Sequence, residues 1–107
     1  MAVLDAEIKN RAVEAVKALA RRGIVRAAYV FGSHANGRFD EWSDIDVAAF
    51  IEGIESWDIW QRTKIMAQVQ MEVGYDIEPH LFPAAALQNP KPESFAADVV
   101  KKGIRIL

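Results

Sequence analysis

The sequence predicts a small mixed β-sheet with helices packed against it, in the α/β or α+β class. Apolar residues recur at helical spacing in some segments, whereas β-branched and aromatic residues concentrate in others. The two kinds of segment follow each other in the order α-β-β-α-β-α, which is typical of one sheet with flanking helices. The chain has 107 residues, of which 51% are hydrophobic, so we expect residues 1–107 to form a single domain.

The first part of the chain predicts a helix followed by two strands. Residues 4–22 place apolar side chains on one helical face, and Gly23 after two arginines is typical of a helix end. Residues 25–31 are predicted to form a strand that ends at Gly32, because β-branched and aromatic residues favour extended backbone. Residues 43–51 give the second strand.

The second part predicts a helix, a strand and a last helix. Residues 57–73 show helical spacing, and residues 75–82 have the composition of a strand. Two prolines then break the chain, and residues 93–102 are expected to form the last helix. Residues 104–107 are either a short strand or a frayed end.

The helix over residues 57–73 is expected to bury its large apolar residues. One of its faces carries four residues at helical spacing: Trp60, Lys64, Ala67 and Met71. Packing in the core is the usual role of aromatic side chains on a helix, so both Trp57 and Trp60 are predicted to be buried.

Composition excludes several classes of protein. The net charge is −2 and the pI about 5.6, which argues against strong nucleic-acid binding, because such domains usually carry a basic surplus. The absence of cysteine excludes disulfides, thiol catalysis and cysteine zinc sites. Charges interrupt the apolar positions of the N-terminal segment, and no apolar run approaches the ~20 residues that span a bilayer. We therefore expect a cytoplasmic protein without membrane contacts.

Two carboxylates stand one residue apart in the second predicted strand. Because alternate side chains of a strand share a face, Asp44 and Asp46 are expected to point the same way. Two like charges so close repel each other unless a cation lies between them. Carboxylate oxygens at this spacing suit Mg²⁺ or Mn²⁺, although acids on a solvated face at the strand end are an equally open interpretation.

The third predicted strand repeats the pattern. Asp76 and Glu78 share a face, and one of them would complete a cluster of three carboxylates if this strand lies beside the second. Such a cluster could hold two metal ions, one at an attacking hydroxyl and one at a leaving group, as in phosphoryl or nucleotidyl transfer.

A Gly-Ser pair ends the first predicted strand. Gly32 permits a tight turn with close backbone approach, and Ser33 adds a hydroxyl next to free backbone N–H groups. Together these groups could cradle terminal phosphates. A plain turn is the alternative, because a lone Gly-Ser pair is a common feature of turns.

In combination these motifs resemble a known family. GSHANGRFDEWSDIDV resembles the signature of the DNA-polymerase-beta-like nucleotidyltransferase superfamily, in which Gly-Ser, a spacer and Asp-hydrophobic-Asp follow each other. Gly37 and the pair Ser43-Asp44 are similar to the minimal nucleotidyltransferase branch, and YDIEPHLFP looks like the strand of the third carboxylate. The resemblance extends over nearly the whole chain and implies the polymerase-beta-like fold.

The resemblance implies a nucleotide site and two metal ions. Gly32 and Ser33 would hold the β- and γ-phosphates of a nucleoside triphosphate, with Ser43 as a further nucleotide-binding residue. Asp44 and Asp46 would be catalytic and would bind two Mg²⁺ (or Mn²⁺) ions. The reaction would be in-line attack of an acceptor oxygen on the α-phosphate of ATP, with pyrophosphate leaving.

The third carboxylate has two candidates. Asp76 is preferred as catalytic residue and metal ligand, because the Asp-hydrophobic pattern aligns best there, and Glu78 is the alternative. His34 lies beside the predicted phosphate cradle and is expected to be a solvated loop residue, with a contact to phosphate as the alternative. His80 is expected to be structural or to support the acids.

The family it resembles also implies a partner. Many minimal nucleotidyltransferases pair with a helical HEPN-type toxin and act as its antitoxin by transferring AMP to it. The chain ends soon after the third-carboxylate strand, which favours an acceptor supplied by another protein. A nucleotidyltransferase for a small molecule and a non-catalytic binding module are the alternatives.

Overall fold

The computed structural model describes residues 4–36, 44–88 and 91–107. The elements in chain order are α1 (Ala6–Ala20), β1 (Ile24–Phe31), α2 (Ser33–Asn36), β2 (Ile45–Glu52), η1 (Ile54–Ser56), α3 (Ile59–Val73), β3 (Ile77–Pro83), η2 (Ala84–Leu87), α4 (Phe95–Lys102) and β4 (Ile104–Arg105). The predicted order of the long elements is confirmed, β4 confirms the short strand expected within residues 104–107, and the short helix α2 is an addition.

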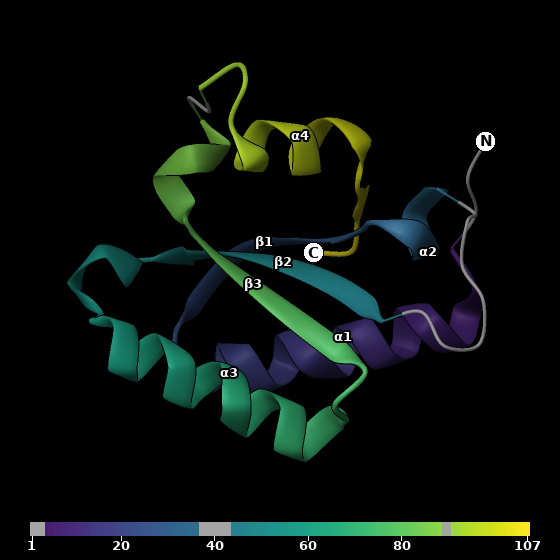
Figure 1. Cartoon of the computed structure of the whole chain (residues 1–107), viewed down its shortest axis with the longest axis horizontal. Coiled ribbons are helices and arrows are strands. Elements are labelled where there is room, and N and C mark those ends of the chain that lie inside the picture. Colours follow the sequence, from purple (N-terminus) through teal and green to yellow (C-terminus); the bar gives the residue numbers. More distant parts are fainter. Residues whose placement is uncertain (1–3, 37–43, 89–90) are drawn as a thin grey trace.

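The strands form one mixed sheet with the order β3-β2-β1-β4. β1 is antiparallel to both β2 and β4, whereas β2 and β3 are parallel. A parallel pair needs a crossover, and α3 supplies it between β2 and β3 (Figure 1). The predicted fold class is therefore confirmed.

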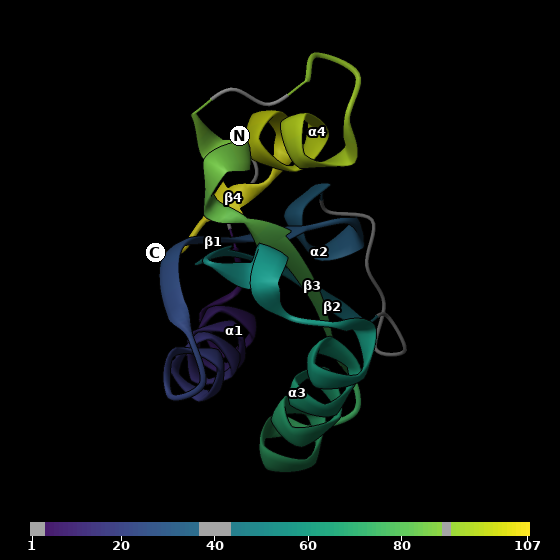
Figure 2. The same ribbon diagram turned by 90° about the vertical axis from the view of Figure 1, so that its left-hand side faces the viewer.

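Helices cover both faces of the sheet. α1 and α3 lie against one face and α4 against the other (Figures 1 and 2). The larger core fills the space under α1 and α3, with Leu19, Val47 and Val69 as fully buried members. A smaller core on the α4 side joins Phe50 and Val99. Because β2 is buried on both faces, its sequence is a nearly continuous apolar run.

Two helix starts follow from capping residues. The Asp5 carboxylate accepts hydrogen bonds from the backbone N–H groups of Glu7 and Ile8 at the start of α1. The Asp58 carboxylate accepts one from Gln61 at the start of α3.

The predicted orientation of α3 was wrong. Its buried residues are Ile65 and Val69, whereas Trp60 is 80% and Met71 72% exposed. Trp57, which precedes the helix, does pack against the larger core. Helical spacing defines a face but does not say which face meets the sheet, and here the face with Ile65 and Val69 lies inward.

None of the helices in the described part of the chain has the length and apolar character needed to cross a membrane.

Candidate active site

The register of the parallel strands brings two acids side by side. Asp46 of β2 is the direct partner of Glu78 in β3. Side chains alternate between the faces of a strand, so His80 lies on the same face as Glu78. On β2, Phe50 shares a face with Asp46 and belongs to the smaller core beside α4. The three polar side chains therefore project from the α4 side of the sheet.

These three side chains converge on one point. The His80 Nε2 atom lies 3.2 Å from Asp46 Oδ1 and 3.8 Å from Glu78 Oε1. One donor atom from each residue lies within 4.8 Å of the others, a grouping that could hold a metal ion. The side chains of Asp46 and His80 are 22% and 24% exposed, and that of Glu78 is 50% exposed. The group is thus largely buried at Asp46 and His80 and open to solvent at Glu78.

Gly32 lies directly against this group. It follows the end of β1, where Phe31 pairs with Asp46, and it has a φ of 74°. A Cβ atom at Gly32 would lie 2.5 Å from Asp46 Oδ2. Both the left-handed backbone and the close approach require glycine here. The predicted Gly-Ser turn therefore does lie beside one of the predicted acids, and Ser33 begins the short α2.

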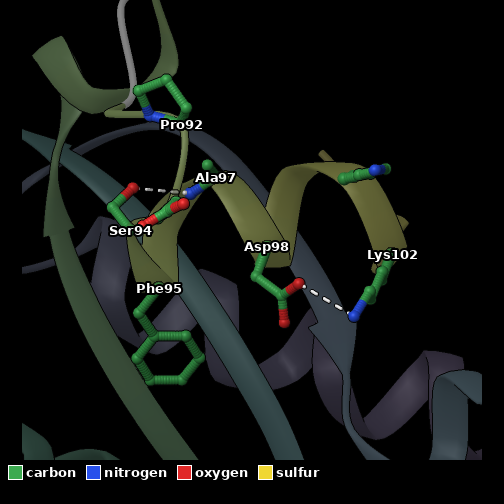
Figure 3. Close-up of a pocket in the computed structure, with 8 residues that line it drawn as sticks. Pro92, Ser94, Phe95, Ala97, Asp98 and Lys102 are labelled. Carbon is green, nitrogen blue, oxygen red and sulfur yellow. Dashed lines mark hydrogen bonds and ion pairs between the residues drawn. The ribbon is translucent and has the colours of Figure 1, made fainter.

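Aromatic rings hold His80 from the side. Its ring centre is 4.9 Å from that of Phe31 and 5.8 Å from that of Phe95, both in edge-to-face contact. Phe95 comes from α4 and points from that helix toward the sheet (Figure 3). It also packs against Phe82 with ring centres 5.5 Å apart. α4 thus contributes one wall of the site.

α4 has polar contacts of its own at its start and along its exposed side. Ser94 caps it by accepting a hydrogen bond of 3.1 Å from the Ala97 N–H, and Asp98 pairs with Lys102 at 3.0 Å (Figure 3). These residues line a surface pocket together with Pro92 and Phe95 (Figure 3). Both contacts stabilise α4 as a helix, the element that carries Phe95.

A shallow apolar groove continues from His80 away from the carboxylates. It runs between α3 and β3 and is lined by Ile59, Arg62, Thr63, Met66, Pro79, His80, Leu81, Phe82 and Phe95. The Arg62 guanidinium is used internally, donating to the carbonyl oxygens of Ile54 and Trp57. The groove therefore offers a ligand mainly apolar surface.

Asp76 lies elsewhere. Its carboxylate pairs with the guanidinium of Arg11 from α1, with one N–O distance of 2.6 Å, and Arg11 also donates to the Val73 carbonyl. The hydrogen bond from Arg11 is the main cause that holds the pKa of Asp76 below its ordinary value. The structure thus brings the alternative acid, Glu78, to Asp46, and it turns the preferred one, Asp76, toward α1.

The remaining predicted residues have different environments. Asp44 precedes β2, is exposed, and does not belong to the group formed by Asp46 with its neighbours in the described part of the chain. Ser43 lies outside the described residues. His34 was expected to be solvated, but it is only 6% exposed, because α2 folds back against the sheet. His80 was given a supporting role, and its position two residues after Glu78 on one strand was the available signal that it belongs to the group.

Comparison with known proteins identifies the family. The family model described as "Polymerase beta, Nucleotidyltransferase" matches residues 14–107. The chain belongs to this nucleotidyltransferase family. No curated protein matches the chain significantly.

Two solved structures share the nucleotidyltransferase fold. A proposed nucleotidyltransferase from Sulfolobus solfataricus is 20% identical, with a TM-score of 0.65 over 92% of this chain and 78% of the other. A toxin-antitoxin structure with AMP-PNP is 22% identical, with a TM-score of 0.62 over 90% of this chain and 72% of the other. At these identities the likeness establishes the fold, and the family resemblance predicted from the motifs is confirmed.

Proposed function

We propose that this chain is a metal-dependent nucleotidyltransferase that moves AMP from ATP onto a hydroxyl group of a partner protein. The proposal rests on one observation. Asp46 and Glu78 are direct partners where β2 pairs with β3, and Gly32 packs against the Asp46 carboxylate. A protein that only binds a partner gains nothing from two acids held together beside a glycine turn.

The donor atoms present fit a divalent cation. Asp46 and Glu78 supply carboxylate oxygens, and His80 adds a nitrogen within the same 4.8 Å group. A bound divalent cation would neutralise phosphate charge and lower the proton affinity of the acceptor hydroxyl. We assign the third-carboxylate role to Glu78, since Asp76 is occupied by Arg11. Asp44, which is exposed and directly precedes β2, would bind the second metal ion.

The protein residues would position the two substrates. The Gly32-Ser33 turn would hold the β- and γ-phosphates through backbone N–H groups and the Ser33 hydroxyl. Glu78 is the most exposed member of the group, at 50%, and its carboxylate would accept a hydrogen bond from the acceptor hydroxyl. Most of the rate acceleration would come from positioning and charge neutralisation, as in other phosphoryl transfers.

The acceptor is proposed to belong to a HEPN-type helical toxin, with this chain as its antitoxin. Two features support a protein acceptor: an apolar groove leads away from His80, and Trp60 stands exposed on α3. The similarity in fold to a toxin-antitoxin structure with AMP-PNP agrees with this role. A cytoplasmic location follows from the proposal and stays a prediction.

The test is transfer of label from ATP to the partner. The chain is incubated with α-labelled ATP, Mn²⁺ or Mg²⁺, and the helical protein encoded by the neighbouring reading frame. We expect label in that protein, lost in Asp46→Asn and retained in Glu55→Gln, which changes an exposed acid on η1. Label that persists in Asp46→Asn, or a toxin that Asp46→Asn still neutralises without label, would contradict the proposal.

A further inference from the structure

We propose that His80 is a direct metal ligand, and that the site consequently prefers a transition-series divalent cation such as Mn²⁺ to Mg²⁺. The inference deepens the proposed function, since it rests on the same metal site. It names a residue outside the aspartate motif and gives the site a chemical preference that carboxylates alone would not have.

The first argument is the direction of one nitrogen atom. His80 Nε2 lies 3.2 Å from Asp46 Oδ1 and 3.8 Å from Glu78 Oε1. A ring N–H that only supported the acids could donate one hydrogen bond, to one of them. The nitrogen makes that one hydrogen bond with Asp46 Oδ1, and Glu78 Oε1 lies near it at 3.8 Å, beyond hydrogen-bond distance. One possible ligand atom from each of the three residues thus lies around a common point.

The second argument is distance. Two neighbouring ligands bound at about 2.1 Å to one octahedral ion lie about 3 Å apart. The separations from Nε2 to the carboxylates, 3.2 and 3.8 Å, are close to that value. Small rotations of the side chains of Asp46 and Glu78 would therefore close the group on an ion without any change in the backbone of β2 or β3.

The third argument is that the ring is already held in place. His80 is 24% exposed and lies in edge-to-face contact with Phe31 and Phe95. Its backbone is part of β3, opposite Ala48, whose small side chain leaves room for the ring. A ligand whose orientation is fixed before the metal arrives loses little conformational freedom on binding.

The chemistry of the donor set decides the preferred ion. Mg²⁺ favours oxygen ligands and keeps several waters, whereas imidazole nitrogen suits transition metals. For mixed nitrogen and oxygen sites the affinity rises from Mn²⁺ through Co²⁺ and beyond. Asp46 and Glu78 alone would accept Mg²⁺, and His80 shifts the balance toward Mn²⁺ and Co²⁺.

The experiment measures metal binding without nucleotide or acceptor. Mn²⁺ is added to the whole chain, free Mn²⁺ is counted by continuous-wave electron paramagnetic resonance, and pulsed measurements record nitrogen coupling to the bound ion. Competition with Mg²⁺ gives the ratio of affinities. We expect imidazole nitrogen coupling in the wild type and at least tenfold tighter binding of Mn²⁺ than of Mg²⁺.

Two variants assign the nitrogen. The chain has two histidines, so His34→Gln is the matched control for His80→Gln. His80→Gln can still donate a hydrogen bond to Asp46, so it removes the metal ligand but keeps the support of the acid. We expect it to lose the nitrogen coupling and to weaken Mn²⁺ binding at least tenfold with little effect on Mg²⁺, whereas His34→Gln keeps the coupling. Thermal melts verify that each variant is folded.

Several outcomes would overturn the inference. These are bound Mn²⁺ without nitrogen coupling in the wild type, no Mn²⁺ binding at all, coupling that disappears in His34→Gln, or an unchanged Mn²⁺ to Mg²⁺ ratio in folded His80→Gln. If His80→Gln does not fold, the inference is tested by nitrogen coupling in the wild type and in His34→Gln, which must be present in both. Nitrogen coupling together with failure of AMP transfer would refute the proposed function and leave the inference standing.

Discussion

Replacing Asp76 with asparagine is expected to destabilise the fold and to leave metal binding intact. Asp76 pairs with Arg11 through both carboxylate oxygens, and the two side chains are 45% and 31% exposed. A hydrogen bond to a charged group contributes about 1.5–3 kcal/mol to the free energy of unfolding, and an exposed ion pair contributes less than about 1 kcal/mol. For this partly exposed ion pair we therefore expect a contribution of about 1 kcal/mol. For a domain of this size that corresponds to a Tm lower by about 4–8 °C.

The pH dependence of this effect has a definite sign. The hydrogen bond from Arg11 lowers the pKa of Asp76 in the folded protein. A lowered pKa contributes stability that is fully present above the unfolded value of about 3.9 and is lost as the pH falls through the folded value. The difference in Tm between the wild type and Asp76→Asn should therefore be largest near neutral pH and shrink below about pH 4. Thermal melts followed by circular dichroism measure it.

Glu78→Gln is the matched comparison for this substitution. Glu78 is half exposed, and no arginine of residues 4–36, 44–88 and 91–107 pairs with it, so its loss should change the Tm little and weaken Mn²⁺ binding at least tenfold. The reasoning would be refuted if Asp76→Asn kept the wild-type Tm and lost Mn²⁺ binding. That result would mean that Asp76 leaves Arg11 and binds the metal.

Four further substitutions, in two matched pairs, test the site and the packing of the helices. Gly32→Ala and Gly53→Ala both put a Cβ on left-handed backbone, with φ 74° and 77°. Each should cost about 1–2 kcal/mol of stability in chemical denaturation, but only Gly32→Ala should also weaken Mn²⁺ binding, since only its Cβ meets Asp46. Trp57→Ala should cost about 2 kcal/mol, and Trp60→Ala less than about 0.5 kcal/mol, because only Trp57 packs on the core; equal losses would contradict this.

Local sequence patterns account for the elements and their order. Strand composition placed the three long strands, and the capping residue Ser94 with Gly103 bounds the last helix close to the predicted limits. The orientation of α3 could not be predicted in the same way. Its outward face carries Trp60 and Met71, and its inward face the smaller Ile65 and Val69, so size gave the wrong answer. Ile65 and Val69 pack in the larger core with residues of α1 and the sheet, and local helical spacing does not encode these contacts with distant parts of the chain.

The choice between the two downstream acids shows a limit of a different kind. Alternation places residues on one face only inside a strand, and β3 begins at Ile77. Asp76 lies before it, next to the turn at Gly74, where φ is 122°. The alternation that grouped Asp76 with Glu78 therefore does not apply there. Which residue lies opposite Asp46 depends on the pairing of β2 with β3, and a parallel pairing across a helix is not visible in local sequence.

The two acids are best understood as having separate tasks at the start of β3. The Asp76 carbonyl accepts a hydrogen bond of 2.7 Å from the Ile45 N–H, and its carboxylate pairs with Arg11, which also holds the Val73 carbonyl. These contacts tie the beginning of β3 to both β2 and α1. The backbone bond, which Asp76→Asn keeps, lies next to the pairing of Ile45 with Ile77, one residue before Glu78 pairs with Asp46. The carboxylate of Asp76 thus has a structural contact with α1, whereas the carboxylate of Glu78 lies beside Asp46 and is the one proposed to bind metal.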